Sequence, residues 1–356
     1  MQENDQSQSL LEQVINASQL RQAIHIVGGN SKPFYGNQPP SSHDLATLSC
    51  AQHAGIIDYE PSELYITARS GTPLKVIEET LAEQQQMLPF EPASFSHGAT
   101  IGGTIACGVS GPRRPFSGAC RDSILGVDII NGLGQPLSFG GHVMKNVAGY
   151  DVSRGMCGTL GTLGLITQVS VKVIPKPDYE TTVVLAADFD HALKCLSELR
   201  QSTLPMSANY FENEHLYIRF NLSAEELEPL NRRFGAIIHD DTQFWHQVKE
   251  QRRPFFSQQE PLWRCSLPIG SPALTLSGNM VAEWNAGLHW YKTQDSAEHI
   301  QQLCQHVGGH AQLFSTKPHE EFLSPPPTAM FNLHKRIKNA FDPHGIFNPN
   351  RLFMGL

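Results

Sequence analysis

Basic side chains are neither abundant nor clustered in this sequence. Its 356 residues include 26 Lys and Arg against 34 Asp and Glu, which gives a formal net charge of −8. Basic residues occur in short pairs, such as Arg113-Arg114, Arg232-Arg233 and Arg252-Arg253. Because DNA and RNA are bound mainly through clustered Lys and Arg, we expect no nucleic-acid partner.

Long apolar runs are also missing. A membrane-spanning helix needs about 20 consecutive, mostly apolar residues, and no segment approaches that length. The first residues, MQENDQSQSLLEQV, are polar and acidic, unlike a secretory signal peptide. These features predict a cytoplasmic protein that would reach a membrane only by docking on partner proteins.

Cysteine and histidine motifs of the metal-binding kind are absent. The seven cysteines are odd in number and scattered, and none forms a Cys-x-x-Cys pair. That spacing disfavours a disulfide framework and an iron–sulfur cluster. Among the 16 histidines, only His306 and His310 have a His-x-x-x-His spacing. The two glycines between them disfavour the helix that would align both rings, so we expect no metal.

Glycine, in contrast, is concentrated in the stretch from His97 to Ile174. More than half of the chain's 29 glycines lie between Gly98 and Gly164. Glycine in regular structure costs backbone entropy, so its density indicates turns with positive φ or close approach of the backbone to a bulky ligand. We interpret the stretch as a surface that holds a large, flat, phosphate-bearing cofactor against main-chain N–H groups.

A second glycine-containing turn follows a predicted strand at Gln22–Val27. It reads Gly28-Gly-Asn-Ser-Lys32. A strand that runs into such a turn offers several free N–H groups, as in an anion-binding nest, although this segment alone favours a plain tight turn. It is neither the Gly-x-Gly-x-x-Gly of a Rossmann fold nor a Walker A loop.

The remaining patterns predict an α+β chain with three parts. Strands and helices alternate up to Pro175 and Pro177, which close the glycine-rich region. A β-α-β-β-α rhythm follows and predicts a sheet covered on one face by helices. The predicted boundaries are residues 1–177 for the first domain, 178–323 for the second, and 324–356 for a C-terminal segment.

Several segments match a known pattern together. They are Gly28-Gly-Asn-Ser31, Ala99-Thr-Ile-Gly-Gly-Thr-Ile-Ala106, Tyr150-Asp151, Gly158-Thr-Leu-Gly-Thr-Leu-Gly-Leu-Ile-Thr167 and Phe341-Asp-Pro-His-Gly-Ile-Phe-Asn-Pro349. They resemble the FAD-binding domain and closing motif of the vanillyl-alcohol oxidase/p-cresol methylhydroxylase (PCMH) superfamily. Within it, Lys145-Asn-Val-Ala-Gly-Tyr-Asp151 and the short chain are most similar to the FAD-binding E subunits of bacterial glycolate oxidases.

The resemblance implies an α+β fold with a PCMH-type, two-subdomain FAD-binding domain and a smaller, ferredoxin-like α+β cap domain. The Gly28–Lys32 turn would wrap the pyrophosphate of FAD, and a loop at Ala99–Ala106 would cover its other side. The implied FAD-binding residues are Gly28, Gly29, Asn30, Ser31, Lys32, Ala99, Thr100, Ile101, Gly102, Gly103, Thr104, Ala106, Gly164, Leu165, Ile166 and Asn348.

Two departures from the family pattern bear on the chemistry. Many relatives carry, in the first turn, a histidine that bonds covalently to the flavin, but this position is Asn30 here. We therefore expect FAD to be held non-covalently. Hydroxy-acid-oxidising relatives also carry a His-x-Gly-Asp-Gly-x-x-His strip, for which this chain has only Gly308-Gly-His-Ala311.

Oxidation of a 2-hydroxy acid would need an arginine to clamp the carboxylate and a base to take the hydroxyl proton. The catalytic residues are not fixed by the sequence. Arg264 is a candidate clamp or a strand-edge charge, and His289 is a candidate base or a packed core histidine. Trp284 could be core or a lid over the flavin. Lys145 could neutralise flavin or phosphate charge, or be a surface lysine.

Three functions remain open. The resemblance implies an FAD-binding subunit of a glycolate (2-hydroxy acid) oxidase, in which electrons from oxidation of glycolate to glyoxylate pass toward an iron–sulfur subunit and the quinone pool. Its partners would be a catalytic flavin subunit and an iron–sulfur subunit, with contact to the inner membrane only through this complex. The alternatives are a self-sufficient FAD-dependent D-lactate-type dehydrogenase and a non-catalytic assembly subunit that retains the fold.

Overall fold

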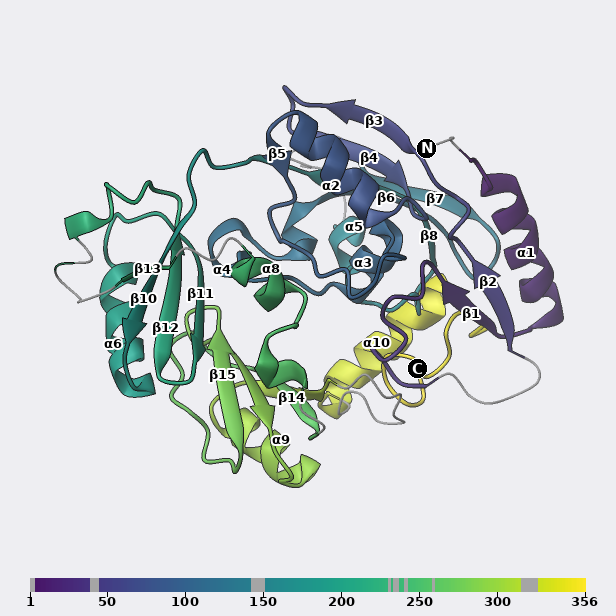
Figure 1. Ribbon diagram of the computed structural model, residues 1–356. Coiled ribbons are helices and arrows are strands. Elements are labelled where there is room, and N and C mark those ends of the chain that lie inside the picture. The colour runs from purple at the N-terminus through teal and green to yellow at the C-terminus, as the bar shows by residue number, and fades with distance from the viewer. Residues whose placement is uncertain are drawn as a thin grey trace. The chain divides into compact units, whose positions relative to one another are not determined.

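The chain is divided into two compact units (Figure 1). The computed structural model describes residues 4–38, 45–141, 151–229, 232, 237–239, 243–257, 260–314 and 326–356. The first unit comprises Met1–Val109, Ala119–Pro175 and Thr316–Leu356, and the second comprises Ser110–Gly118 and Lys176–Ser315. Ser110–Gly118 therefore groups with the second unit, although its sequence lies inside the glycine-rich stretch assigned to the first domain.

The first unit begins with a helix packed on a small parallel pair of strands (Figure 1). These elements are α1 (Ser7–Leu20), β1 (Ile24–Val27) and β2 (Ala46–Ser49). The buried side of α1 is formed by Leu10, Val14 and Ala17, which share a core with Ile24 and Phe347. This packing holds β1 and the C-terminal segment together, so the turn after β1 begins from a fixed strand.

The larger part of the first unit is an antiparallel five-stranded sheet with helices on it. The strand order is β3 (Ile56–Glu60), β4 (Tyr65–Arg69), β8 (Leu165–Lys172), β6 (Ile124–Ile130) and β7 (Pro136–Gly140). The helices are α2 (Leu74–Glu83), α3 (Ile101–Cys107) and α5 (Val152–Gly155), and β5 (Gln86–Met87) pairs with β9 (Ile174–Pro175). Alternate residues such as Val169 and Val171 pack against Leu74 and Ile105 in one core, as a half-buried strand requires.

Helix α3 replaces the loop expected at Ala99–Ala106. Its cap is Thr100, whose hydroxyl accepts a hydrogen bond from the Gly103 N–H at 3.2 Å. Ile101 and Ile105, four residues apart, bury one side of the helix in the core. Packing and capping therefore override the poor helix propensity of the two glycines. The opposite side of α3, with Gly103 and Ala106, lines a cleft.

The second unit is built on an antiparallel eight-stranded sheet. Its strand order is β13 (Ile237–His239), β10 (Thr181–Ala186), β12 (His215–Phe220), β11 (Met206–Glu212), β15 (Asn279–Glu283), β16 (Leu288–Lys292), β14 (Leu262–Ser266) and β17 (His310–Leu313). Helices α6 (Phe189–Arg200) and α9 (Ala297–His306) share cores with the sheet. Shorter helices are α4 (Arg114–Ser117), α8 (Phe244–Lys249) and the 3-10 turns Cys120–Ser123, in the first unit, and Pro254–Ser257.

The C-terminal segment completes the first unit. Helix α10 (Thr328–Phe341) leads into a closing turn, and Phe347 then forms a parallel bridge with Ile24 of β1. The Asn348 N–H donates to the Ile24 carbonyl at 2.9 Å. Residues more than 300 positions apart are thus joined at the edge of the cleft. Within the described ranges, no helix has the length and apolarity needed to span a bilayer.

Candidate cofactor site

The two predicted glycine segments meet directly. A Cβ atom at Gly29 would lie 1.3 Å from the Gly98 carbonyl oxygen, and one at Gly28 would lie 2.5 Å from the Thr100 hydroxyl. Any larger residue would push the turn after β1 away from the start of α3. The turn also contains Asn30 with φ 49°, a left-handed conformation that asparagine tolerates. Close backbone approach, rather than side-chain chemistry, therefore explains these glycines.

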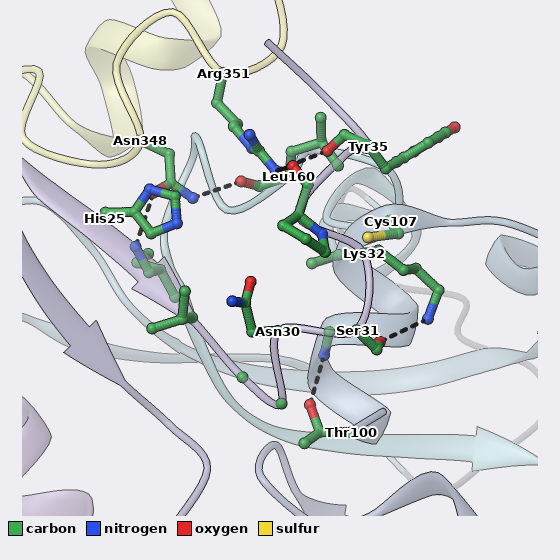
Figure 2. A pocket seen from close by; sticks show the side chains of 17 residues that line it. His25, Asn30, Ser31, Lys32, Tyr35, Thr100, Cys107, Leu160, Asn348 and Arg351 are labelled. Carbon is green, nitrogen blue, oxygen red and sulfur yellow. Dashed lines mark hydrogen bonds between the residues drawn. The ribbon is translucent and has the colours of Figure 1, made fainter. Parts of the chain in front are cut away.

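This meeting point borders a cleft of about 580 Å³ (Figure 2). Its wall is made of the Gly28–Lys32 turn, α3 and the C-terminal segment, all in the first unit. The lining residues are His25, Ile26, Val27, Gly28, Gly29, Asn30, Ser31, Lys32, Pro33, Tyr35, Thr100, Gly103, Ala106, Cys107, Leu160, Asn348 and Arg351.

A second compartment of about 430 Å³ adjoins the first. Both compartments are lined by Ile26, Gly28, Thr100, Gly103, Ala106, Leu160 and Asn348, which we call the waist. The second compartment adds Cys50, Ser70, Gly102, Gly161, Gly164 and Ile166. The site thus has two chambers joined at a wall rich in glycine and small residues.

Most of the residues that the resemblance implied are placed at this site. Gly28, Gly29, Asn30, Ser31, Lys32, Thr100, Gly103, Ala106 and Asn348 line the first compartment, and Gly102, Gly164 and Ile166 line the second. The exceptions are Ala99, Ile101, Thr104 and Leu165, which line neither. These four side chains are at most 3% exposed and lie within the protein interior, because α3, the residue just before its cap and β8 each turn one side inward.

Asn348 binds main chain on both sides of the cleft. Its side-chain oxygen accepts a hydrogen bond from the Ile26 N–H at 2.8 Å, and its side-chain nitrogen donates to the Leu160 carbonyl at 2.6 Å. Figure 2 shows this amide between β1 and the turn that carries Leu160. Asn348 therefore fixes the shape of the waist through its side chain, a role that the family pattern alone did not indicate.

Arg351 is a site residue that the sequence analysis missed. Its guanidinium donates to the carbonyls of Pro33, Tyr35 and Asn37 at 3.1, 2.9 and 2.5 Å. The side chain is 8% exposed, and burial lowers its pKa. A basic residue three positions after Asn348, in the run of turns that ends the closing motif, was the available signal. Arg351 both anchors residues 33–37 and adds positive charge to the cleft.

Lys32 supplies a second positive charge to the same compartment. Its ammonium lies 3.4 Å from the Ser31 hydroxyl and 5.6 Å from the centroid of the Phe95 ring. His25, also on this wall, has its pKa lowered by burial and, to a smaller extent, by Arg351. The compartment therefore combines two cations with main-chain N–H groups, which suits a bound phosphate.

Comparison with known proteins accounts for this arrangement. Residues 6–140 match the FAD binding domain model, and residues 327–352 match that of the C-terminal domain of FAD linked oxidases. Glycolate oxidase subunit GlcE of Escherichia coli is 40% identical over 356 residues, which cover all of both chains. The chain belongs to the GlcE family. The expected family and the FAD cofactor are thereby confirmed.

Other relatives are similar to this chain over only part of its length. Glycolate oxidase subunit GlcD of Bacillus subtilis is 28% identical over 53% of the chain and 40% of that protein. Mitochondrial D-lactate dehydrogenase [cytochrome] 1 of Saccharomyces cerevisiae is 29% identical over 54% of the chain and 34% of that protein. A structure of alkyldihydroxyacetonephosphate synthase has a TM-score of 0.67 at 14% identity, over 96% of this chain and 74% of that one. The expected PCMH-type α+β fold is confirmed.

The two catalytic candidates in the second unit do not form one site. Arg264 of β14 is opposite Trp290 of β16, and Cys265 is opposite His289. Since successive residues in a strand point to opposite faces, Arg264 and His289 lie on opposite faces of the sheet. Arg264 donates to Ser266 and Gln312 at 3.1 Å each.

His289 is fully buried and lies against helix α6. Its ring is 5.5 Å from that of Phe189, and its Nδ1 is 3.4 Å from the Tyr291 hydroxyl. Trp284, also considered as a lid, is 4% exposed and donates from Nε1 to the Gly111 carbonyl at 3.0 Å, as a packed core residue does. Lys145 lies outside the described residues. Within the described ranges, no group of three or more His, Cys, Asp or Glu is placed to bind a metal ion.

His289 is expected to make the protein sensitive to acid. Burial lowers its pKa from 6.5 to about 4, so the folded state keeps the ring neutral while the unfolded state takes up a proton below pH 6.5. Its contribution to stability is complete above pH 6.5 and is lost as the pH falls toward 4. In urea denaturation, His289→Leu should reduce the loss of stability between pH 7 and pH 5 by about 2 kcal/mol. The exposed control His306→Leu should not, and equal acid dependence in both variants would contradict the assignment.

Proposed function

We propose that this chain is the FAD-binding subunit of a glycolate oxidase, which oxidises glycolate to glyoxylate and passes the electrons toward an iron–sulfur subunit and the quinone pool. The observation that carries this proposal is the two-chambered cleft in a chain that is similar to GlcE over its whole length. The partial similarity to GlcD and to D-lactate dehydrogenases supports the same class of substrate, a small 2-hydroxy acid.

The residues of the cleft fit FAD. A dinucleotide has two bulky ends joined by a pyrophosphate, and the two compartments are joined at a waist where Gly28 and Gly103 expose main chain. Lys32 and Arg351 add positive charge on the side of the first compartment. When bound, FAD supplies a two-electron acceptor. The protein's part is to hold the pyrophosphate with backbone N–H groups and cations, and to enclose the two ends.

The proposed partners are a catalytic flavin subunit and an iron–sulfur subunit. The E. coli relative is named as a subunit of glycolate oxidase, which supports a multi-subunit assembly. The two electrons that a flavin would accept from the substrate need a further carrier, and the scattered cysteines of this chain do not provide the spacing of an iron–sulfur ligand set. We place the complex in the cytoplasm, with the inner membrane reached through partner subunits.

The test is an absorbance spectrum of the purified chain, followed by anaerobic addition of glycolate and of D-lactate. The visible bands of an oxidised flavin should be present and should persist with either acid until the partner subunits are added. Bleaching in the isolated chain would instead identify a self-sufficient dehydrogenase. Bands that resist glycolate even in the full complex would favour an assembly role, and a colourless chain that cannot be loaded with FAD would refute the cofactor assignment.

We also propose that FAD is held non-covalently, because Asn30 occupies the position at which a histidine would attach the flavin. Precipitation of the flavin-loaded protein with acid should release essentially all the flavin into the supernatant, measured by its absorbance. His25 and Cys107 also line the first compartment and carry nucleophilic atoms. Flavin that stays with the pellet would contradict the proposal, and its release from a His25→Ala or Cys107→Ala variant would then identify the attachment residue.

A further inference from the structure

Helix α10 exposes apolar side chains and buries a lysine (yellow in Figure 1). Met330, Leu333 and Ile337 are 49, 44 and 37% exposed. Lys338 is the only buried residue of this helix, all of which the structure describes. A helix that packs only on its own protein does the reverse, with an apolar stripe against the core and its charges in water. Folding of this chain alone therefore does not account for the apolar side of α10.

The exposed apolar residues lie on one side of the helix. Met330, Leu333 and Ile337 have the spacing i, i+3 and i+7, and the exposed Ala329 and Ala340 extend the same side. At 3.6 residues per turn, the five lie within about a third of the helix circumference. We call these five residues the outer stripe. The anchors of a helix that docks in a groove of another protein recur at this spacing.

The charge at the edge of the outer stripe is positive. Helix α10 contains no Asp or Glu, although the whole chain has a net charge of −8. Arg336 is exposed, and it lies three residues after Leu333 and four before Ala340, which places it beside the outer stripe. The surface is thus apolar with one positive edge. It complements an apolar groove that has a carboxylate at its border.

A different subunit fits this surface better than a membrane or a second copy does. Helices that lie on anionic lipid carry several Lys or Arg on their polar face, whereas the charge that borders the outer stripe is Arg336, and the net charge of −8 opposes approach to such a surface. A second copy that docked through its own α10 would bring another Arg336 in place of a carboxylate. Full-length similarity to GlcE, which is named as a subunit, implies a multi-subunit complex, in which part of this chain's surface is covered.

The same helix is joined to the wall of the cofactor site. The Lys338 ammonium donates to the carbonyls of Thr162 and Phe347 at 2.6 and 2.8 Å. Thr162 follows Gly161, which lines the second compartment, and Phe347 precedes Asn348, which lines both. A carrier that takes electrons from a flavin has to come close to it. A partner docked on α10 would lie on a helix that contacts this wall.

We propose that the outer stripe of α10 is the docking surface for the iron–sulfur subunit of the complex. That subunit would present an apolar groove for Met330, Leu333 and Ile337, with an Asp or Glu at its border opposite Arg336. This inference rests on the proposed function, because the partner is the electron carrier that the proposed function requires. It explains why α10 leaves apolar side chains in water while a lysine is buried.

The experiment compares Leu333→Glu with the matched control Leu133→Glu. Leu133 is also 44% exposed, in the turn between β6 and β7. The tagged chain is co-expressed in pairs, with the iron–sulfur subunit or with the catalytic flavin subunit, and the partner recovered per chain is measured. Leu333→Glu should lower recovery of the iron–sulfur subunit by about tenfold or more, because it would bury a carboxylate in an apolar groove. Leu133→Glu should leave recovery unchanged.

Two further measurements separate docking from folding. Both Leu variants should keep the flavin absorbance and the melting temperature of the unmodified chain, because both positions are exposed and glutamate is a good helix former. Arg336→Gln should lower recovery of the iron–sulfur subunit at low salt and make it less dependent on salt concentration, since a screened charge pair is lost. Equal salt dependence in Arg336→Gln and the unmodified chain would contradict the predicted carboxylate.

The outcomes distinguish the inference from the proposed function. If the unmodified chain and Leu333→Glu retain the iron–sulfur subunit equally, the inference is wrong and the proposed function stands. The inference is also overturned if Leu333→Glu instead abolishes retention of the catalytic flavin subunit, self-association of the chain, or binding to vesicles of phosphatidylcholine and phosphatidylglycerol. An unmodified chain that retains neither partner would refute the proposed assembly and the inference together.

Discussion

Replacing Lys338 with methionine is expected to lower the free energy of unfolding by about 3–5 kcal/mol, as removal of one partner from a buried ion pair does. The Lys338 ammonium donates to the Asp342 carboxylate at 2.7 Å and to the carbonyls of Thr162 and Phe347 at 2.6 and 2.8 Å. Lys338 is 5% exposed and Asp342 is 1% exposed. Methionine keeps the apolar stem but leaves a buried carboxylate and two carbonyls without their cation.

The ion pair matters because Asp342 also shapes the closing motif. Its two carboxylate oxygens accept hydrogen bonds from the N–H groups of Ile346 and Phe347 at 3.0 and 2.8 Å. The next residue, Asn348, ties the motif to the waist of the cofactor site. Lys338→Met should therefore weaken FAD binding as well as stability, even though Lys338 lines neither compartment.

Urea denaturation measures the first effect, with Lys335→Met as the matched control. Lys335 lies on the exposed side of the same helix, where its ammonium is 4.8 Å from the Phe331 ring. Such exposed contacts contribute about 0.5–1 kcal/mol. The double variant Lys338→Met/Asp342→Leu, which removes both charges, should recover part of the lost stability. Equal losses from Lys338→Met and Lys335→Met would show that the buried pair contributes no more than a surface contact.

The sequence predicted the α+β class because local patterns determine most elements. Leu74, Ile77 and Leu81 recur at helical spacing and form the buried side of α2, and Val169 and Val171 alternate as the inner face of β8. Helix α3 was missed because Thr-Ile-Gly-Gly-Thr has the composition of a loop. Its stability comes from a cap and from tertiary packing, which a local pattern does not encode.

The candidate site was predictable where glycine itself is the signal, and less so elsewhere. Gly28 and Gly29 marked the turn, but their contact with Gly98 and Thr100 joins segments about 70 residues apart and appears only in the fold. Arg351 and Ser70 also line the two compartments, but neither belongs to a glycine pattern, and the sequence analysis did not predict them as site residues.

Strand register limited the catalytic assignment as well. Arg264 and His289 were each reasonable alone, but whether two strand residues share a face depends on the pairing of β14 with β16. A shift of one residue would reverse that outcome. Which side chains meet through strand pairing could therefore be determined only from the structure. The backbone sites marked by glycine, in contrast, could be predicted from the sequence.

Gly103→Ala is expected to lower the affinity for FAD at least tenfold while leaving the fold intact. Gly103 lines both compartments at the waist, where close approach of the backbone to the ligand is required. A Cβ at this position would meet only the Thr100 hydroxyl, at 3.2 Å. A small shift of the Thr100 hydroxyl would admit the added methyl group, and alanine is the better helix former. The methyl would instead occupy space at the waist, where the proposed function puts the pyrophosphate of FAD.

Gly155→Ala is the matched control for this variant. Gly155 is an exposed residue of α5, and a Cβ added there would meet nothing within 4 Å. Fluorescence titration with FAD and thermal denaturation of both variants separate binding from folding. Gly103→Ala should keep the melting temperature of the unmodified apo-protein but bind FAD weakly, and Gly103→Leu should bind it more weakly still. The controls Gly155→Ala and Gly155→Leu should behave as the unmodified chain. Unchanged FAD affinity in Gly103→Leu would place the cofactor elsewhere, because a side chain of that size cannot share the waist with a pyrophosphate.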